Sequence, residues 1–257
     1  MLSADDLVWL KDNYPALRYD GHTIQGRINF DMSYDPKTGQ YVYFPEAVDT
    51  LKPGVIHHMD DYLVRLTWVR NGLRYPVANE LENKIKSVAT DRNLSNNDLH
   101  LSGNGDLCLA APQDLSIDFS EEFSLQLFIQ RYLLPYLFLQ THFKESGEWA
   151  WDTSEHGLAG IFGWSHKHSD SASKERTLKE IGEHIQVDYA TNILRKIRKD
   201  YYKGHMPCLC DSNNPPKRIR DCCPNAQLGL NEIRKELILV LLKRVGSWPV
   251  SAQLQSS

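Results

Sequence analysis

The stretch HTIQGRINFDMSYD, residues 22–35, alternates apolar and polar side chains with a period of two. Ile28, Phe30 and Met32 fall on one side of this alternation, and residues such as Arg27 fall on the other. Side chains of a β-strand point alternately to its two faces, so the pattern predicts a strand with one buried face. Such a strand needs neighbours, and the flanking sequence offers candidates for them.

Two segments of similar character follow this strand, QYVYF at 40–44 and YLVRLTWVR at 62–70, each after a turn-rich stretch. Three short strands in succession predict an antiparallel meander. On the N-terminal side, residues 4–13 predict a short helix with Ser3 as its N-cap.

Beyond the strands, residues 86–118 are rich in Asn, Asp, Ser and Gly, and we expect a long irregular region there. Residues 121–144 then have helical spacing, with Ser120 as the expected cap. Pro135 lies inside this segment, so it must kink the helix or begin a second one.

The polar stretch SHKHSDSASKE, residues 165–175, is the expected linker between two domains. Helical spacing resumes after it, and a last helix is expected over 229–246. We therefore expect an α+β fold, with a sheet domain over 1–164 and a helical extension over 176–257.

Composition excludes several classes of protein. The 257 residues are 41% hydrophobic and 24% charged, which is ordinary for a globular chain. The net charge is −4, so the chain as a whole does not favour phosphates, and a nucleic-acid partner is not expected unless the contact is local. The longest apolar run, 237–242, is far shorter than the ~20 residues that cross a membrane. We expect a cytoplasmic protein with no membrane partner.

Four of the five cysteines, Cys208, Cys210, Cys222 and Cys223, lie within sixteen residues. Two close pairs around a polar loop can place four thiolates around one Zn²⁺, which is the expected structural cofactor. Free or disulfide-linked cysteines are the alternative. The spacing resembles the small zinc motif at the C-terminus of the SecA translocation ATPase, with a longer loop that keeps several basic residues.

Cys108 stands apart from that group, in the stretch LHLSGNGDLCLAAP at 99–112. A reactive cysteine requires exposure, and the preceding glycine-rich turn suits it. The alternative is a buried thiol packed beside Leu107 and Leu109. Pro112 is expected to prevent a regular helix from following at once.

The order of helix, strands, Tyr75-Pro76, long loop and further helices resembles the ubiquitin-conjugating enzyme family over about residues 4–145. GDLCLAAP is similar to the family's G-x-I-C-L sequence around the catalytic cysteine, with Leu107 at the position of the isoleucine, and this similarity places Cys108 at the catalytic position. Where the family has His-Pro-Asn, this chain has Asp98-Leu99-His100. In this respect it looks more like bacterial relatives that occur beside ubiquitin-like, activating-enzyme and anti-phage genes.

The resemblance implies a transferase that accepts the C-terminal carbonyl of another protein as a thioester on Cys108 and passes it to an amine. His100 would replace the family's asparagine, by donating a hydrogen bond to the oxyanion or by holding the loop through backbone carbonyls, and Asp106 and Asp114 would orient the incoming amine. A surface histidine is the alternative for His100. The implied partners are a ubiquitin-activating-like enzyme and either a ubiquitin-like protein or a cGAS-like nucleotidyltransferase, in a conjugation or antiviral defence system. The alternative is an inactive adaptor with the same fold, which only binds such proteins.

Three further histidines, His156, His166 and His168, lie in one aromatic and glycine-rich stretch. They have no partner at a recognised metal-ligand spacing, so a packed structural loop is the preferred interpretation. His156 is the one to test for proximity to Cys108, where it would join Asp106 and Asp114 in orienting the substrate.

Overall fold

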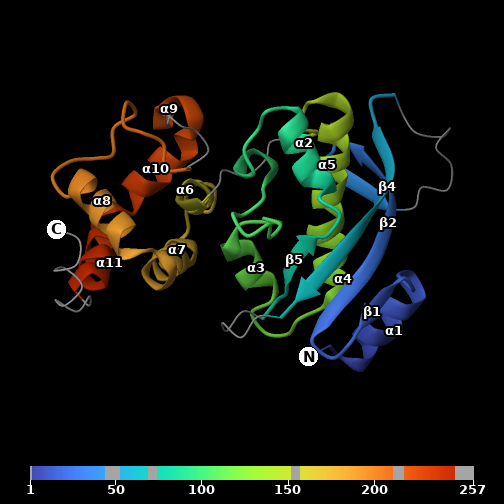
Figure 1. Ribbon diagram of the computed structural model, residues 1–257. Coiled ribbons are helices and arrows are strands. Elements are labelled where there is room, and N and C mark those ends of the chain that lie inside the picture. The colour runs from blue at the N-terminus through green and yellow to red at the C-terminus, as the bar shows by residue number, and fades with distance from the viewer. Residues whose placement is uncertain (1, 44–52, 69–73, 152–156, 211–216, 247–257) are drawn as a thin grey trace. The chain divides into compact units, whose positions relative to one another are not determined.

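The computed structural model describes residues 2–43, 53–68, 74–151, 157–210 and 217–246 (Figure 1). The chain divides into two compact units, one of residues 1–110 with 114–153 and the other of 154–257 with 111–113. Each unit packs around a hydrophobic core of its own.

The first unit combines helices with one antiparallel sheet, which confirms the α+β class. Its helices are α1 (Ala4–Asn13), α2 (Lys84–Asp91), α3 (Pro112–Asp118), α4 (Leu125–Phe128) and α5 (Leu134–Ser146). Its strands are β1 (Leu17–Tyr19), β2 (Thr23–Asp35), β3 (Gln40–Tyr43), β4 (Ile56–Thr67) and β5 (Val77–Glu80). Helix α5 lies alongside β2 and β4 (Figure 1).

The strand order is β1-β2-β4-β5, and β3 pairs with β2. The expected meander is therefore wrong in one connection, because β4 pairs with β2 and not with β3. β2 is long enough to pair with two short strands as well as β4: its first residues pair with β1 and its last with β3. The prediction of a long irregular region over 86–118 is also wrong, since these residues contain most of α2, a 3₁₀ turn at Asn97–Leu99, and α3.

The alternation in β2 has the predicted effect. Ile24, Ile28 and Met32 are completely buried in the core of this unit, while Gln25 and Arg27 are exposed on the opposite face. Burial of this continuous apolar face is the main contribution that the strand makes to stability.

Helix α1 begins as predicted, because the Ser3 side chain accepts a hydrogen bond from the backbone of Asp6 and Asp6 caps Ser3 in return. The buried Asp6 carboxylate also accepts from the backbone N–H of Leu125, 2.8 Å away, at the start of α4. One side chain thus links α1 to a helix more than a hundred residues later.

The helix expected over 121–144 runs from α4 through a π-helical turn, Ile129–Leu133, into α5. Its cap is Ser124 and not Ser120, since the Ser124 hydroxyl accepts from the N–H of Leu127. Pro135 lies in the first turn of α5, where a missing N–H costs little, and the π-helical turn directly precedes it.

Two histidines share a hydrogen bond where β4 meets α5. His58 Nε2 lies 2.9 Å from His142 Nδ1, and Glu145 lies 3.2 Å from the other nitrogen of His58. Burial lowers the pKa of both imidazoles below the usual 6.5, and Glu145 opposes this effect only in part. The neutral form of both rings is therefore favoured in the folded protein, and one ring N–H lies in the hydrogen bond between them.

Because the unfolded chain binds protons at these histidines more readily than the folded one, stability should fall with acidification. The contribution of the two neutral histidines to the free energy of unfolding is complete above pH 6.5. It is lost as the pH falls through their lowered pKa values in the folded state. Urea unfolding followed by tryptophan fluorescence should show this loss, and His142→Gln should reduce it. The exposed His22 offers the matched control, and a His22→Gln variant with an equally reduced pH dependence would contradict the assignment.

The second unit is helical. Its elements are α6 (Gly157–Lys167), α7 (Ser171–His184), α8 (Val187–Ile197), α9 (Ile219–Cys222), α10 (Pro224–Glu232) and α11 (Arg234–Gly246). The stretch 165–175, expected as the linker, holds the end of α6 and the start of α7, while the two units divide near residue 153. The helix expected over 229–246 breaks at Ile233 between α10 and α11. None of the described helices combines the length and hydropathy required to cross a membrane.

Candidate functional site

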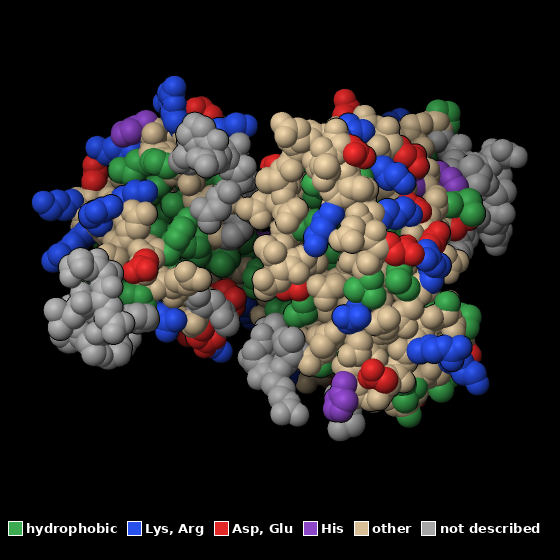
Figure 2. Space-filling model, in the orientation of Figure 1, with side chains coloured by type: hydrophobic (Ala, Val, Ile, Leu, Met, Phe, Trp, Pro, Cys, Tyr) green, Lys and Arg blue, Asp and Glu red, His purple; other side chains and the backbone are tan. Residues whose placement is uncertain are grey.

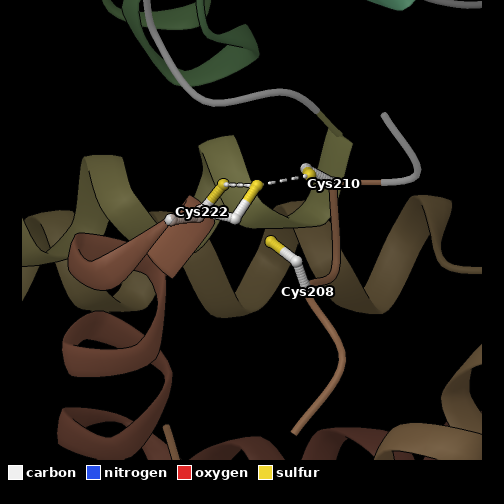
Figure 3. Close-up of side chains that lie close together, drawn as sticks. Cys208, Cys210 and Cys222 are labelled. Atoms are coloured by element: carbon white, nitrogen blue, oxygen red, sulfur yellow. Dashed lines mark hydrogen bonds between the residues drawn. The ribbon is translucent and has the colours of Figure 1, made fainter. Parts of the chain in front are cut away.

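The four clustered cysteines converge on one point in the second unit (Figure 3). The Sγ atoms of Cys208, Cys210, Cys222 and Cys223 all lie within 4.8 Å of one another. Two of the sulfur–sulfur distances, 3.5 Å between Cys210 and Cys222 and 3.7 Å between Cys222 and Cys223, are close to the ~3.8 Å spacing of a tetrahedron with ~2.3 Å metal–sulfur bonds. The donor set therefore fits one metal ion.

Two short segments bring these cysteines together. Pro207 pairs with Arg218 as in antiparallel strands, and the N–H of Cys208 donates to the carbonyl of Lys217 at 2.7 Å. Cys222 then ends α9, and Cys223 is the N-cap residue of α10, so Cys223 lies at the positive end of the α10 dipole.

The pKa values of these thiols reflect how close the sulfur atoms lie to one another. The neighbouring Cys210 thiol raises the pKa of Cys208 to about 12, and the Cys208 and Cys210 thiols raise the pKa of Cys223 far above its usual value. Several negative charges at this spacing repel one another unless a cation lies between them. The arrangement is chemically suited to a cation and unfavourable for free thiolates.

Cys108 lies on a small β-hairpin in the first unit. Its backbone N–H donates to the carbonyl of His100 at 2.8 Å, and the N–H of Ser102 donates to the backbone carbonyl of Asp106. Between these two hydrogen bonds, Leu101 and Leu107 pair as in antiparallel strands. The hairpin explains the eight-residue spacing between His100 and Cys108, because the two residues are paired across it. The backbone carbonyl of His100 thus helps to hold the strand that carries Cys108.

The hairpin is braced on both sides. Leu107 donates its N–H to Ala78 of β5 at 2.8 Å, which adds the hairpin to the edge of the sheet. From α5, the Tyr136 hydroxyl and the Gln140 amide donate to the carbonyl of Leu99 at 3.1 and 2.9 Å. Because these donors come from a buried helix, the base of the hairpin is held in one position.

The Cys108 thiol is exposed, whereas Leu107 beside it is buried. Residues two apart in an extended strand share a face, so Asp106 lies on the same face as the thiol. Asn79 of β5 donates to the Asp106 carboxylate at 2.8 Å and so fixes its position. The protein atoms around the thiol still raise the pKa of Cys108 by desolvation, so the neutral form predominates at neutral pH.

The other predicted residues have different positions. The His100 ring is buried and meets Trp149 edge-on. Asp114 lies in the first turn of α3, where its charge is among those that raise the pKa of Tyr132. His156 lies outside the described residues.

His166 and His168 have structural contacts within the second unit. His166 lies 2.8 Å from Glu232 of α10, and His168 stacks on Trp164 one turn earlier in α6. These contacts are consistent with the interpretation of this stretch as a packed structural segment.

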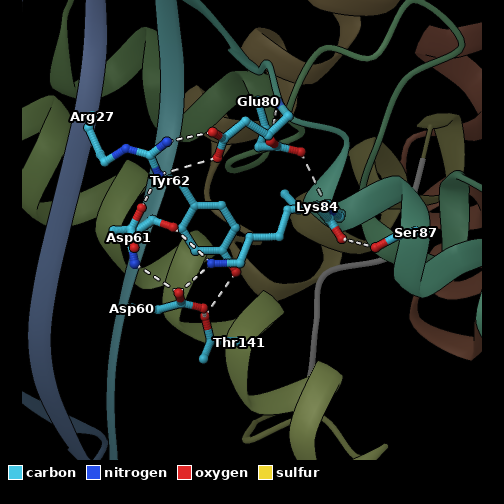
Figure 4. Close-up of polar contacts among 10 residues, drawn as sticks. Arg27, Asp60, Asp61, Tyr62, Glu80, Lys84, Ser87 and Thr141 are labelled. Carbon is cyan, nitrogen blue, oxygen red and sulfur yellow. Dashed lines mark hydrogen bonds and ion pairs between the residues drawn. The ribbon is translucent and has the colours of Figure 1, made fainter.

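Sequence reasoning missed a polar network that connects β4, α2 and α5 (Figure 4). Lys84, at the start of α2, donates to the Asp60 carboxylate, which also accepts from Thr141 of α5 at 2.9 Å. Burial raises the pKa of Asp60, but the hydrogen bonds from Lys84, Thr141 and the backbone outweigh it, so the pKa is below its usual value. No local pattern marks these residues, because they come from three separate elements.

Comparison of the chain with protein-family models, with curated proteins and with solved structures gave no match.

Proposed function

We propose that the first unit carries an acyl group as a thioester on Cys108 and transfers it to an amine, as in ubiquitin conjugation. The observation that carries the proposal is an exposed thiol on a hairpin that is braced by β5 and α5. A nucleophile that must meet two different proteins in turn needs exposure and a fixed position.

The reaction has two steps. The Cys108 sulfur attacks the donor thioester, a new carbon–sulfur bond forms, and the donor thiol leaves with the proton. An amine then attacks the same carbonyl carbon, the bond to Cys108 breaks, and the amine's proton returns to the sulfur. Asp106, held by Asn79 on the same face, would accept a hydrogen bond from the incoming amine. The proposed donor is a ubiquitin-activating-like enzyme loaded with a ubiquitin-like protein or with the C-terminus of a signalling nucleotidyltransferase.

The test combines the full chain with a candidate activating enzyme, its carrier protein and ATP. An adduct should form on Cys108 and disappear on addition of excess thiol. Cys108→Ala should abolish it completely, and Cys108→Ser should give an ester that resists thiols because oxygen replaces sulfur. An adduct that persists in Cys108→Ala would refute the assignment of the nucleophile.

One observation favours the adaptor as a second candidate. Desolvation raises the pKa of Cys108, so little thiolate is present at neutral pH. Alkylation by iodoacetamide separates the two functions. A Cys108 that reacts much more slowly than free cysteine, together with tight binding of the carrier protein and no adduct, would establish the adaptor.

For the second unit we propose that the ion is Zn²⁺ and that its role is structural. Four thiolates complete a tetrahedral shell, so they leave no position for a water or a substrate. Three of the four cysteines are buried, which favours a closed site.

A further inference from the structure

The two units carry opposite charge. Residues 1–153 hold 13 Lys and Arg against 22 Asp and Glu, whereas residues 154–257 hold 16 against 11. The net charge of the first unit is −9 and that of the second is +5, and the two add up to the −4 of the whole chain. Whole-chain charge therefore does not exclude a polyanion as a partner of the second unit.

The exposed cations of the second unit concentrate between the end of α8 and the start of α9. We call them the basic face: Arg195, Arg198, Lys199, Lys203, Lys217, Arg218 and Arg220. In Figure 2, Lys and Arg side chains gather over the part of this unit that holds α8 and α9.

Contacts within the unit hold the basic face together. The side chain of Arg220 packs against Gly204, next to Lys203, and the backbone N–H of Arg220 donates to the Gly204 carbonyl at 3.2 Å. Arg234 of α11 donates to the carbonyls of Ile197 and Asp200 and so holds the end of α8. The cysteine site joins the two segments that carry Lys203 and Lys217.

Acidic side chains neutralise only part of this charge. Asp200 pairs with Lys203 at 2.7 Å, and Asp221 lies within 3.7 Å of both Arg218 and Arg220. The remaining cations, Arg195, Arg198, Lys199 and Lys217, form no ion pair with any other residue that the structure describes. Exposed cations that have no acidic partner are available to phosphates.

An exposed aromatic ring lies among these cations. Tyr201 is 58% exposed, although Tyr202 beside it is completely buried. The Arg234 guanidinium lies 5.3 Å from the centre of the Tyr201 ring. Base stacking on an exposed ring beside phosphate-binding cations is how single strands are bound without sequence preference. An acidic protein would use the cations but would give no role to the ring.

We propose that the basic face binds single-stranded nucleic acid, with phosphates on its cations and a base on Tyr201. The unstacked bases of a single strand can reach the ring, whereas those of a duplex cannot. The proposal is independent of the thioester chemistry, since Cys108 belongs to the other unit.

The test is fluorescence anisotropy of the full, metal-loaded chain with labelled oligouridine of about 15 nucleotides. Affinity should fall steeply with salt, because phosphate binding releases counterions. Combining Arg198→Glu with Lys199→Glu should weaken binding at least about tenfold and flatten the salt dependence. Tyr201→Ala should weaken it about 5- to 100-fold and leave the salt dependence unchanged.

The matched control combines Lys179→Glu with Lys243→Glu, which changes the charge equally on exposed parts of α7 and α11. It should bind as the unaltered chain does, and so should Cys108→Ala. Absence of binding at about 50 mM salt would overturn the proposal. So would tighter binding to a duplex of the same length. Polyglutamate that competes as well as RNA, with Tyr201→Ala unaffected, would instead assign the face to an acidic protein.

Discussion

Removal of the metal from the four-cysteine site should unfold much of the second unit. The ion would join the segment at Cys208 to the start of α10, and structural zinc contributes on the order of 10 kcal/mol to the folding of small domains. Without it, the four sulfurs have no cation to hold them at contact distance. We expect one metal ion per chain by elemental analysis.

Hydrogen exchange gives the local measurement. After chelation, amides of α8, α10 and α11 should lose protection, and β2 and β4 in the other unit should keep it. Cys223→Ser should behave like the chelated protein. Cys108→Ala removes the only cysteine outside the cluster, so it serves as the matched control and should keep its metal. Full protection of α10 after complete removal of the metal would show that the site does not hold the fold.

Gly229→Ala should destabilise the second unit by about 2–3 kcal/mol, because α10 and α6 approach too closely for a side chain there. A Cβ at Gly229 would lie 1.9 Å from the carbonyl oxygen of Phe162 and 2.8 Å from its carbon. Both are backbone atoms of α6, so no side chain can rotate to relieve the clash. The helices would have to separate, and buried Phe162 would lose contacts.

Gly182→Ala on α7 is the matched substitution. Among the described residues its Cβ would meet only a methyl group of Val240, at 3.1 Å, and alanine favours the helix by about 0.5–1 kcal/mol. We expect a change close to zero in urea unfolding for this variant, against a clear loss for Gly229→Ala. Equal losses of stability in the two variants would show that the close approach of α10 to α6 at Gly229 is not the cause of the effect.

The features predicted from sequence are those that a short segment determines by itself. Ser3 and Asp6 cap their helix within four residues, and the alternation in β2 depends only on neighbouring positions. The cysteine site was also predictable, because its four ligands lie in sixteen residues and their chemistry has few other uses.

Features that depend on distant contacts were missed. The hairpin at Cys108 is positioned by β5, which precedes it, and by Tyr136 and Gln140, about thirty residues later. His100 adopts a positive φ of 54°, which its sequence context does not indicate. Pro112 was expected to exclude a helix, yet it is the first residue of α3, where proline is well tolerated because its N–H has no helical partner.

The Leu101–Leu107 bridge has an evolutionary consequence. Leu101 and Leu107 face the core, so the number of residues between them determines whether the next side chain, Cys108, faces solvent. A slip of one residue in the pairing would turn the thiol inward and expose a leucine. Descendants of this chain should therefore accept substitutions at the tip, Gly103 and Asn104, far more readily than a change in its length. Among homologues, an unchanged spacing from Leu101 to Cys108 would be the mark of selection on the thiol.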